Sequence, residues 1–315
     1  MKSYKEIYHP SVLVKESIEA LKVKDAKVGL DCTLGGAGHT IAFLKANPNL
    51  KIIAIDQDEE VIEVAKERLK EEGLLERVSI YYANFKDFDL VLKEENIDKL
   101  DFIFFDLGVS HFQLRSDRGF SYWEDMPLDM RMDKALRKTA ADIVNSYKEK
   151  ELEKIFKIYG EEKYASQIAK EILKYRSRKK ITSTLELSQI IEKVYLSRYL
   201  KKKEVSQNDL NKYKDKYRQI FKKHPATKVF QALRIEVNKE FEVLKEALSK
   251  VSNFLKTYGR LGVITFHSLE DKMVKNILKE DPSMKLIDIF LPSQDEIKNN
   301  IASRSAKLRV YEKRY

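Results

Sequence analysis

Short apolar runs alternate with amphipathic segments through the first hundred residues of the chain. Short apolar runs that end at Asp or Asn are typical of strands buried on both faces of a parallel sheet. Segments between them have the spacing of helices, at residues 41–46 and 59–72. The apolar runs lie at residues 28–31, 52–56, 78–82 and 102–106. The order predicts an α/β protein with a parallel, doubly wound, Rossmann-like sheet.

The strand pattern stops after residue 114, and a series of helical segments follows. Their predicted ranges are 140–159, 161–175, 184–200 and 208–222. A long helix with an apolar face from Val229 to Leu255, ended by Tyr258-Gly259, then returns the chain to α/β character. It is followed by a strand at 261–266, a helix at 269–279 and strands at 284–290 and 306–311.

These elements predict one α/β domain, residues 1–114 and 224–315, interrupted by an all-helical insertion, residues 115–223. The insertion follows the fourth strand. In an open parallel sheet, loops at the carboxyl ends of the strands line the ligand crevice. We therefore expect the insertion to hang over the active site and to recognise the substrate.

The positive charge of the chain is concentrated in that insertion. The chain has 60 Lys and Arg against 50 Asp and Glu, and residues 134–223 contain 25 of the former and 12 of the latter. Aromatic residues are interleaved with these cations, at Tyr195, Tyr199, Tyr213, Tyr217 and Phe221. Cations neutralise phosphates and aromatic rings stack on bases, so the segment predicts nucleic-acid contact. A solvated helical surface whose rings face their own core is the alternative.

Several classes of protein are excluded by what the sequence lacks. A single cysteine, Cys32, rules out an internal disulfide framework and a cysteine-based zinc cluster. The five histidines share no ligand-like spacing, so no metal is expected. No apolar run reaches the roughly 18 residues that a membrane span needs, and the N-terminus has no apolar signal core. A cytoplasmic protein without membrane contact is therefore expected.

Candidate ligand-binding residues follow the predicted strands. Residues 35–38, Gly-Gly-Ala-Gly, allow close approach of the backbone to a ligand, or only a tight strand-to-helix connection. Asp56 ends the second strand, where a carboxylate can accept both ribose hydroxyls. This pair fits a dinucleotide and S-adenosylmethionine equally well. Phe85 could lie against adenine or in the core. Asp106 stands where a methyltransferase needs polar groups, or caps the end of its strand.

Nine short sequence motifs are distributed over nearly the whole chain. They are HPSVL (9–13), DCTLGGAGH (31–39), DLGVS (106–110), QL (113–114), RGFS (118–121), PLDMRMD (127–133), FQALRI (230–235) with VN (237–238), FHSLED (266–271) and RSAKLR (304–309). In these blocks the chain resembles the RsmH (MraW) family of small-subunit ribosomal RNA cytosine-N4 methyltransferases. The resemblance implies a class I methyltransferase sheet with an inserted helical domain. It also implies S-adenosyl-L-methionine as cofactor and N4-methylation of one cytidine in the decoding region of 16S ribosomal RNA.

The resemblance also implies a set of cofactor-binding residues, carried over by position. They are Ala37, Gly38, His39, Asp56, Phe85, Asp106 and Gln113. The chain departs from the family pattern at Ala37, usually glycine, where a methyl group is expected to be tolerated only if φ is negative. It departs again at His111-Phe112, usually Ser-Pro, and at Met126, a common glycine.

Asp106 is the predicted catalytic residue. With neighbouring backbone carbonyls it would accept hydrogen bonds from the cytosine amine and so orient the nitrogen lone pair. Further substrate-binding candidates each have a structural alternative. Asp129, Arg131 and Asp133 would order the active site or form an ion pair. Gln231, Arg234 and Asn238 share a helix face and would contact RNA or anchor a loop.

Two further groups of candidates lie near the C-terminus. His267 is expected to line the crevice, because Ser268 and Asp271 are too close in sequence to form a hydrolase triad with it. Arg304, Lys307 and Arg309 would meet phosphates or lie on an exposed edge strand.

Two other functions compete with an RNA methyltransferase. An NAD-dependent oxidoreductase would need a regular glycine fingerprint, which is absent because Ile41 stands at the third glycine position. A non-enzymatic RNA-binding protein would not need the set Gly38, Asp56 and Asp106. The expected partner is 16S ribosomal RNA within the small ribosomal subunit, and a homodimer stays open as the oligomeric state.

Overall fold

The computed structural model describes residues 10–202 and 204–315, so His9 of the first sequence block and most of the N-terminal stretch lie outside the described part. The chain divides into two compact units. Unit 1 comprises the residues up to Phe112 together with Phe241–Tyr315, and unit 2 comprises Gln113–Glu240. Unit 2 thus spans residues 113–240, whereas the predicted insertion spans residues 115–223.

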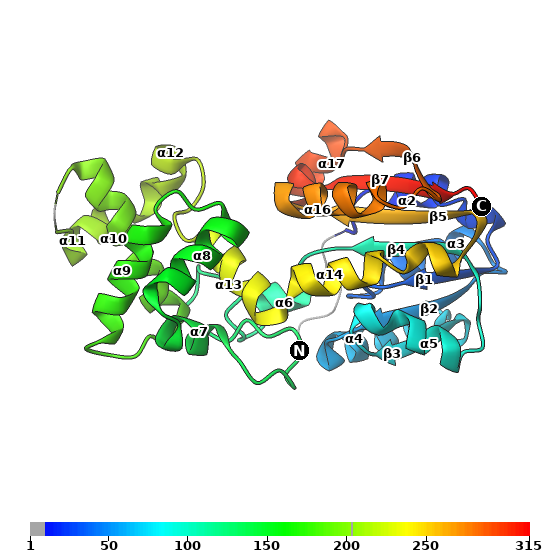
Figure 1. Ribbon diagram of the computed structural model, residues 1–315, viewed down its shortest axis with the longest axis horizontal. Helices are drawn as coiled ribbons and strands as arrows, with labels where there is room; N and C mark the ends of the chain where they lie inside the picture. The colour runs from blue at the N-terminus through cyan, green and yellow to red at the C-terminus, as the bar shows by residue number, and fades with distance from the viewer. Residues whose placement is uncertain (1–9, 203) are drawn as a thin grey trace. The chain divides into compact units, whose positions relative to one another are not determined.

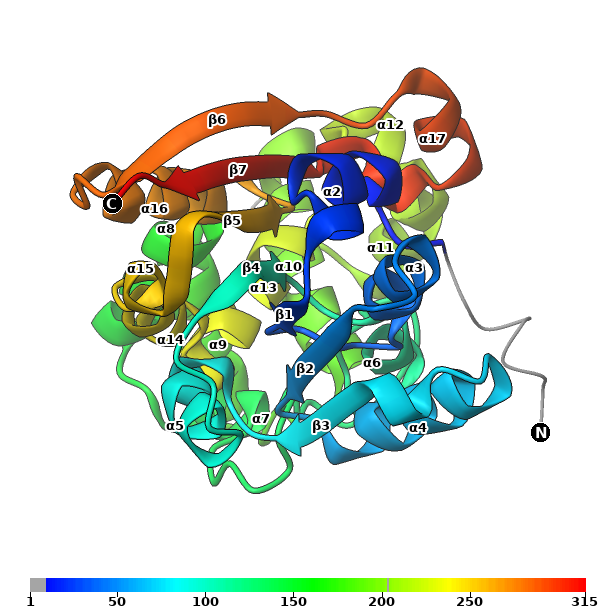
Figure 2. The ribbon, with the colours of Figure 1, turned by 90° about the vertical axis from the view of Figure 1, so that its right-hand side faces the viewer.

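Unit 1 is built on a seven-stranded sheet in the order β3-β2-β1-β4-β5-β7-β6 (Figures 1 and 2). The strands are β1 (Val28–Asp31), β2 (Lys51–Asp56), β3 (Val78–Tyr82), β4 (Leu100–Asp106), β5 (Leu255–Thr265), β6 (Met284–Phe290) and β7 (Lys307–Lys313). All seven predicted strands are present. Strands β1 to β5 are mutually parallel, whereas β7 is antiparallel to both β5 and β6. The sheet is therefore mixed, not wholly parallel.

Helices cover both faces of the sheet, so unit 1 has three layers (Figure 2). On one face α2 (Val14–Ala20), α3 (Gly38–Ala46) and α4 (Glu59–Glu71) enclose a core around Phe102 and Phe104. On the other face lie α5 (Phe88–Glu94), α14 (Glu240–Leu248), α15 (Val251–Phe254) and α16 (Ser268–Lys279), around a core with Ile103 and Phe105. Alternate residues of β4 thus supply opposite cores, as the two-residue period of a strand requires.

The remaining elements of unit 1 are short. They are α17 (Gln294–Asn299) and the 3₁₀ turns η1 (Val23–Asp25), η2 (Leu75–Arg77), η3 (Phe85–Asp87) and η5 (Ile301–Ser305). Strand β6 is the exposed edge, and Leu286, Ile287 and Ile289 on it are between 37% and 40% exposed.

Unit 2 is helical, and its described residues contain no β-structure beyond one isolated bridge between Pro127 and Ser183. Its elements are α6 (His111–Arg115), α7 (Ala140–Ser146), α8 (Glu149–Gly160), α9 (Ala165–Arg176), α10 (Thr184–Leu200), α11 (Gln207–Tyr213), η4 (Lys214–Lys216), α12 (Tyr217–Phe221) and α13 (Thr227–Asn238). A capping box begins α10, because Ser183 and Glu186 exchange hydrogen bonds.

Three of the predicted helices are interrupted. The helix expected at 140–159 breaks at Tyr147, whose backbone is extended, and the one at 208–222 contains a 3₁₀ turn. The long helix from Val229 ends at Lys239, where φ is +53°, and α14 and α15 follow separately. The chain is already a strand at Leu255, because its backbone pairs with Leu100 of β4. The apolar spacing continues across these breaks and therefore conceals them.

Helix α13 belongs to unit 2 because it packs tightly against α8. A Cβ atom added at Gly160 would lie 2.5 Å from the carbonyl oxygen of Lys228, so only glycine permits this approach. The Tyr147 hydroxyl also donates a hydrogen bond to Glu236 Oε1 at 2.6 Å. These contacts explain why the boundary lies after α13.

Candidate active site

The carboxyl ends of β1, β2 and β4 bring three aspartates to one edge of the sheet in unit 1. Asp31 ends β1 and is buried; it accepts hydrogen bonds from the backbone N–H of Thr33 (3.1 Å) and the hydroxyl of Thr40 (2.6 Å). Thr33 in turn accepts the backbone N–H of Asp106 at 2.6 Å. Burial raises the pKa of Asp31 to about 6. This aspartate joins the glycine-rich turn to the end of β4.

The glycine-rich turn contains two left-handed residues. Gly35 has φ +51°, and Ala37, the N-cap of α3, has φ +61°. The expectation that a methyl group at Ala37 is tolerated only at negative φ is therefore wrong. Its methyl group is fully buried, so packing offsets a left-handed conformation that costs an L-residue about 1–2 kcal/mol. The turn keeps the shape that glycine would give it.

Asp56 ends β2 and faces this turn. Its Oδ2 accepts the backbone N–H of Gly35 (2.9 Å), and its Oδ1 accepts that of Asp58 (3.0 Å). Each carboxylate oxygen can accept a second hydrogen bond, so the residue could also bind ribose hydroxyls. Burial raises the pKa of Asp56 to about 7.

Asp106 and His39 form a pair at the end of β4. His39 Nε2 donates to the backbone oxygen of Val12 at 2.9 Å, which leaves a lone pair on Nδ1, 3.4 Å from Asp106 Oδ2. Burial lowers the pKa of His39 to about 4. Burial, followed by the negative charges of Asp31 and Glu270, raises the pKa of Asp106 to about 8. At neutral pH Asp106 is therefore protonated and His39 is neutral.

Asp106 Oδ1 has no hydrogen-bond partner within the part of the chain that the structure describes. A buried polar atom without a partner costs about 1–3 kcal/mol, and such an atom is a common sign of an absent ligand. This orphaned oxygen, the turn and Asp56 suit a ligand that combines a ribose with a polar or charged group.

The other two cofactor candidates are Phe85 and Gln113. Phe85 is partly buried at the start of η3, and its ring meets Phe105 edge-on with centroids 5.4 Å apart. Phe85 therefore packs against the core of unit 1, which was the alternative to a contact with adenine. Gln113 is buried in α6 and belongs to unit 2. Close to the turn, Asn84 donates to Gln57 Oε1 at 2.7 Å, a pair that the sequence reasoning missed.

His267 is engaged with its own helix. Its Nδ1 accepts the backbone N–H of Glu270, while Glu270 Oε2 accepts the backbone N–H groups of Phe266 and His267. Asp271 is bound elsewhere, by Lys307 Nζ (2.9 Å) and Arg309 Nε (2.6 Å). A hydrolase triad is thus absent from residues 267–271, as expected.

Lys307 and Arg309 of β7 form ion pairs with an acidic residue of the same unit. Arg309 is 6% exposed, and β7 lies between β5 and β6, so the expected edge strand is instead β6. Lys307 and Arg309 are held by Asp271, whereas Arg304 in η5 is exposed. Arg304 therefore remains the candidate of this group with a side chain open to a phosphate.

In unit 2, most of the candidate substrate residues hold a loop together. Arg131 grips Asp129 with two hydrogen bonds (2.7 and 2.8 Å), and Asp133 Oδ1 accepts the N–H of Ala135. Asn238 accepts the N–H of Met132 and donates to the carbonyl of Met130, each at 2.8 Å. The structural ion pair and the loop anchor are therefore both present.

The other two residues of that helix face also have partners in unit 2. Arg234 forms two hydrogen bonds with Glu240 (2.7 and 2.8 Å), and Gln231 Nε2 donates to the carbonyl of Tyr159 at 2.9 Å. These contacts favour anchoring over direct RNA contact for this face.

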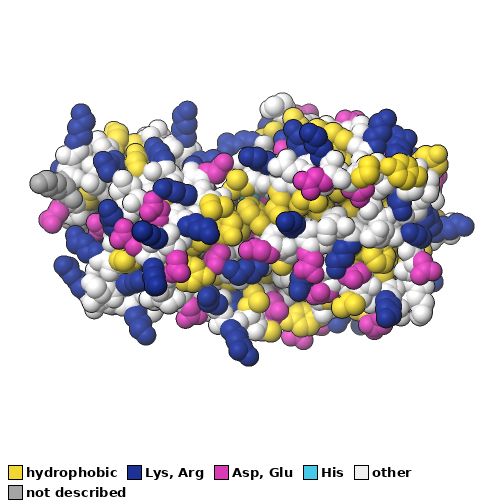
Figure 3. Space-filling model, viewed as in Figure 1, with side chains coloured by type: hydrophobic (Ala, Val, Ile, Leu, Met, Phe, Trp, Pro, Cys, Tyr) yellow, Lys and Arg dark blue, Asp and Glu magenta, His cyan; other side chains and the backbone are white. Residues whose placement is uncertain are grey.

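The aromatic residues of the basic segment differ in their burial. Tyr195 and Tyr217 are buried, and their hydroxyls donate to Glu162 and Glu192. Tyr199, by contrast, is 52% exposed. Lys and Arg side chains project among acidic ones on the face of α8–α11 that Figure 3 shows. Some of the aromatic residues therefore build the unit, while the cations stay in solvent.

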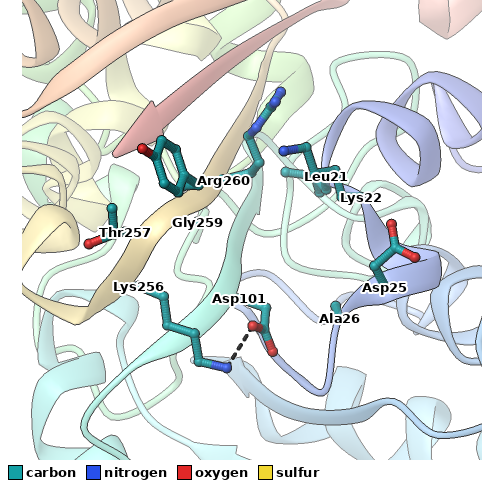
Figure 4. Close-up of a pocket in the computed structure, with 10 residues that line it drawn as sticks. Leu21, Lys22, Asp25, Ala26, Asp101, Lys256, Thr257, Gly259 and Arg260 are labelled. Carbon is teal, nitrogen blue, oxygen red and sulfur yellow. Dashed lines mark hydrogen bonds and ion pairs between the residues drawn. The ribbon is translucent and has the colours of Figure 1, made fainter. Parts of the chain in front are cut away.

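A separate hollow of about 140 Å³ lies at the opposite edge of the sheet, beside the amino ends of β1 and β4 (Figure 4). It is lined by Lys22, Asp101, Lys256 and Arg260 among others. Asp101 accepts the backbone N–H of Lys27 and Val28 and the ammonium of Lys256. Asp101 is thus already occupied by protein groups, and no predicted site residue lies there.

Among residues 10–202 and 204–315, no three His, Cys, Asp or Glu side chains are grouped so as to hold a metal ion. Within the same residues, no helix has both the length and the apolar surface that crossing a bilayer requires.

A sheet in this order, with an antiparallel β7 beside β5, has the class I methyltransferase fold, here with an all-helical insertion. The sequence profile of the MraW methylase family matches residues 6–314. The chain belongs to that family. The prediction of S-adenosyl-L-methionine as the methyl donor is confirmed at the level of the family.

Relatives support this assignment over the full chain. "Ribosomal RNA small subunit methyltransferase H" of Sulfurihydrogenibium sp. (strain YO3AOP1) is 45% identical over 309 residues, covering 96% of this chain and 98% of the relative. The protein of the same name from Clostridium botulinum (strain Loch Maree / Type A3) is 42% identical over 330 residues, covering 98% and 99%. Among solved structures, an rRNA methylase from Streptococcus thermophilus is 11% identical, with a TM-score of 0.43 and coverage of 96% and 94%.

Proposed function

We propose that this chain transfers a methyl group from S-adenosyl-L-methionine to the N4 amine of a cytidine in the decoding region of 16S ribosomal RNA, within the small ribosomal subunit. The names of its relatives support the RNA substrate. The observation that carries the proposed chemistry is Asp106, a largely buried carboxyl at the end of β4 with one oxygen free of protein hydrogen bonds.

The proposed cofactor site consists of the turn at residues 35–38, Asp56 and Phe85. Asp56 would accept the ribose hydroxyls, and Phe85 would lie against the adenine. When bound, S-adenosyl-L-methionine supplies an electrophilic methyl group on a positively charged sulfonium. Positive charge beside a buried carboxyl lowers its pKa, so Asp106 would be ionised in the loaded site.

Asp106 is proposed to position the amine and to accept its proton. The cytosine amine is a weak nucleophile because its lone pair is delocalised into the ring. A hydrogen bond from the amine to Asp106 Oδ1 would orient the nitrogen, and the same oxygen could take the N–H proton that is lost as the N–CH₃ bond forms. A carboxyl with a pKa near the working pH suits both roles.

His39 is proposed as a positioning residue. Because the carbonyl of Val12 fixes its tautomer, Nδ1 can only accept, so His39 would hold the protonated carboxyl through Oδ2 before the cofactor binds. Oδ1 is then left for the substrate. The base must leave its stack to reach this site, and unit 2 is proposed to bind the surrounding RNA. Unit 2 carries 31 Lys and Arg against 19 Asp and Glu, which suits that role.

The test uses tritiated S-adenosyl-L-methionine and small ribosomal subunits that lack the modification, followed by digestion and identification of the labelled nucleoside. We expect the label in N4-methylcytidine. Label in another nucleoside would overturn the proposed base. Absence of label and of cofactor binding would instead favour a non-enzymatic RNA-binding protein.

Two variants sharpen this experiment. Asp106→Asn should lower the turnover about 100-fold or more while changing RNA affinity little. Glu63→Gln, which removes an exposed carboxylate on α4, should leave both unchanged. Equal losses of turnover and RNA affinity in Asp106→Asn would contradict the proposed role of this carboxyl.

A further inference from the structure

We propose that Trp123 in unit 2 is a stacking platform for a base of the RNA substrate. The inference rests on the proposed function, because it takes RNA to be the substrate. Trp123 is the only tryptophan of the chain and is 53% exposed. It lies between the RGFS and PLDMRMD blocks and belongs to neither.

Two aromatic rings support the indole. Tyr122 and His224 are stacked, with centroids 4.5 Å apart and ring planes 15° from parallel. The indole centroid lies 5.2 Å from Tyr122 and 5.0 Å from His224. These distances lie within the range of favourable ring contacts. Trp123 is thus the outermost ring of a three-ring group.

Hydrogen bonds and buried polar contacts hold the rings of Tyr122 and His224 in place. The Tyr122 hydroxyl and Thr227 Oγ1 are hydrogen-bonded at 3.0 Å. His224 is buried, accepts the backbone N–H of Ala226 at 3.2 Å and has Nε2 3.4 Å from Glu192 Oε1. Because these side chains are already ordered, a base that stacks on the indole need not pay their ordering entropy.

Glu192 in turn is held by neighbours in unit 2. It accepts the Tyr217 hydroxyl at 3.0 Å and the Ser188 hydroxyl at 2.7 Å, and all three residues are buried. The network therefore extends from the exposed indole into the centre of the unit. Such satisfied buried networks rigidify the surface they support.

The charges around the platform favour a nucleic-acid base over another ligand. Lys222 and Lys223, directly before His224, are exposed, and unit 2 carries a net charge of +12 from its 31 basic and 19 acidic residues. Glu124 and Asp125, directly after Trp123, are also exposed and would repel a phosphate at the indole itself. We therefore infer that the indole meets the face of a base, while cations farther away meet the backbone.

The single tryptophan makes the test direct. Intrinsic fluorescence is followed while the full-length protein is titrated with an RNA hairpin that carries the decoding-region sequence, and with an abasic oligomer of equal length. Stacking should quench the emission saturably with the hairpin and not with the abasic oligomer. Hairpin binding by fluorescence anisotropy of a labelled RNA, without any change in indole emission, would overturn the proposal. Failure of the hairpin to bind would do the same.

Two substitutions provide matched controls. Loss of base–aromatic stacking costs about 1–3 kcal/mol, so Trp123→Ala should weaken RNA binding about 5- to 150-fold. Trp123→Phe, which keeps a ring, should retain most of the affinity, and neither should change the affinity for S-adenosyl-L-methionine. Circular dichroism of both variants checks that unit 2 remains folded. Unchanged RNA affinity in folded Trp123→Ala would refute the platform.

These measurements separate the platform from the proposed reaction. Quenching without methyl transfer would support the platform and count against N4-methylation. Methyl transfer without quenching would support the reaction and overturn the platform.

Discussion

Replacement of Asp106 by asparagine should make this protein more stable at neutral pH while removing its proposed activity. Asparagine has nearly the same shape, and its amide N–H can donate to His39 Nδ1 as the protonated carboxyl does. What changes is the capacity to ionise. The pKa of Asp106 is raised to about 8 from 3.8, first by burial and then by Asp31 and Glu270.

The sign and size of this stability difference follow from the number of protons that the folded and unfolded states bind. Between about pH 4 and pH 8 the unfolded chain has an ionised Asp106 and the folded protein a protonated one, so the folded state binds more protons. Stability of the wild type therefore falls as the pH rises through this window. The limit is about 1.4 kcal/mol per pH unit. Because the side chain is 26% exposed, water reduces this, and we expect about 2 kcal/mol between pH 5 and pH 7.

The measurement is urea unfolding of both proteins at about pH 5, pH 6 and pH 7, followed by far-ultraviolet circular dichroism. The advantage of Asp106→Asn over the wild type should grow with pH. Asp31 and Asp56 are present in both proteins, so most of their own pH dependence cancels. Glu63→Gln serves as a control with no trend. A difference that stays constant with pH, or a variant less stable at pH 7, would refute the reasoning.

Four other substitutions test the structural roles. Asn238→Ala leaves the buried N–H of Met132 and the carbonyl of Met130 unpaired and should lower the free energy of unfolding by about 3 kcal/mol, measured by urea titration with indole fluorescence; Gln231→Ala should cost only about 1 kcal/mol. Asp271→Ala leaves the buried Arg309 without its carboxylate and should cost about 3–5 kcal/mol by the same method, with RNA affinity unchanged. Ala37→Gly relieves a left-handed residue but removes a buried methyl group, so its melting should reveal a change within about 1 kcal/mol; a larger loss would show that the methyl group is indispensable.

The sheet was predictable because its strands carry their own signal. Runs such as residues 78–82 and 284–290 coincide with β3 and β6 without correction. The direction of β7 was not predictable, since an apolar run reads the same in either direction. Helix breaks at Tyr147 and Lys239 were also concealed, because the apolar spacing continues on both sides of a single residue with a non-helical backbone.

The site could be predicted only where one residue type at one strand end suffices. Asp56 and Asp106 end the two strands that flank β1, at the same edge of the sheet, as their positions in the sequence imply. Partners distant in sequence were out of reach: the carbonyl of Val12 fixes His39, and Asp271 neutralises Lys307 and Arg309. A cationic side chain read as a phosphate ligand can equally be one half of a buried pair, and only the fold distinguishes the two.

The placement of β5 beside β4 affects how the protein folds while it is being synthesised. These neighbouring strands are separated in the chain by the whole of unit 2, so a ribosome that synthesises the chain delivers β4 long before β5. Until then β4, with the sequence LDFIFFD, lacks the strand that covers its second edge. An uncovered apolar edge invites pairing with other chains.

Unit 2 emerges during this interval and can bury its own apolar residues, whereas the sheet must wait for its last three strands. The closing step joins segments far apart along the chain and is therefore expected to be slow. We therefore expect the nascent protein to need protection of β4, by a chaperone or by the ribosome surface, until β5 arrives.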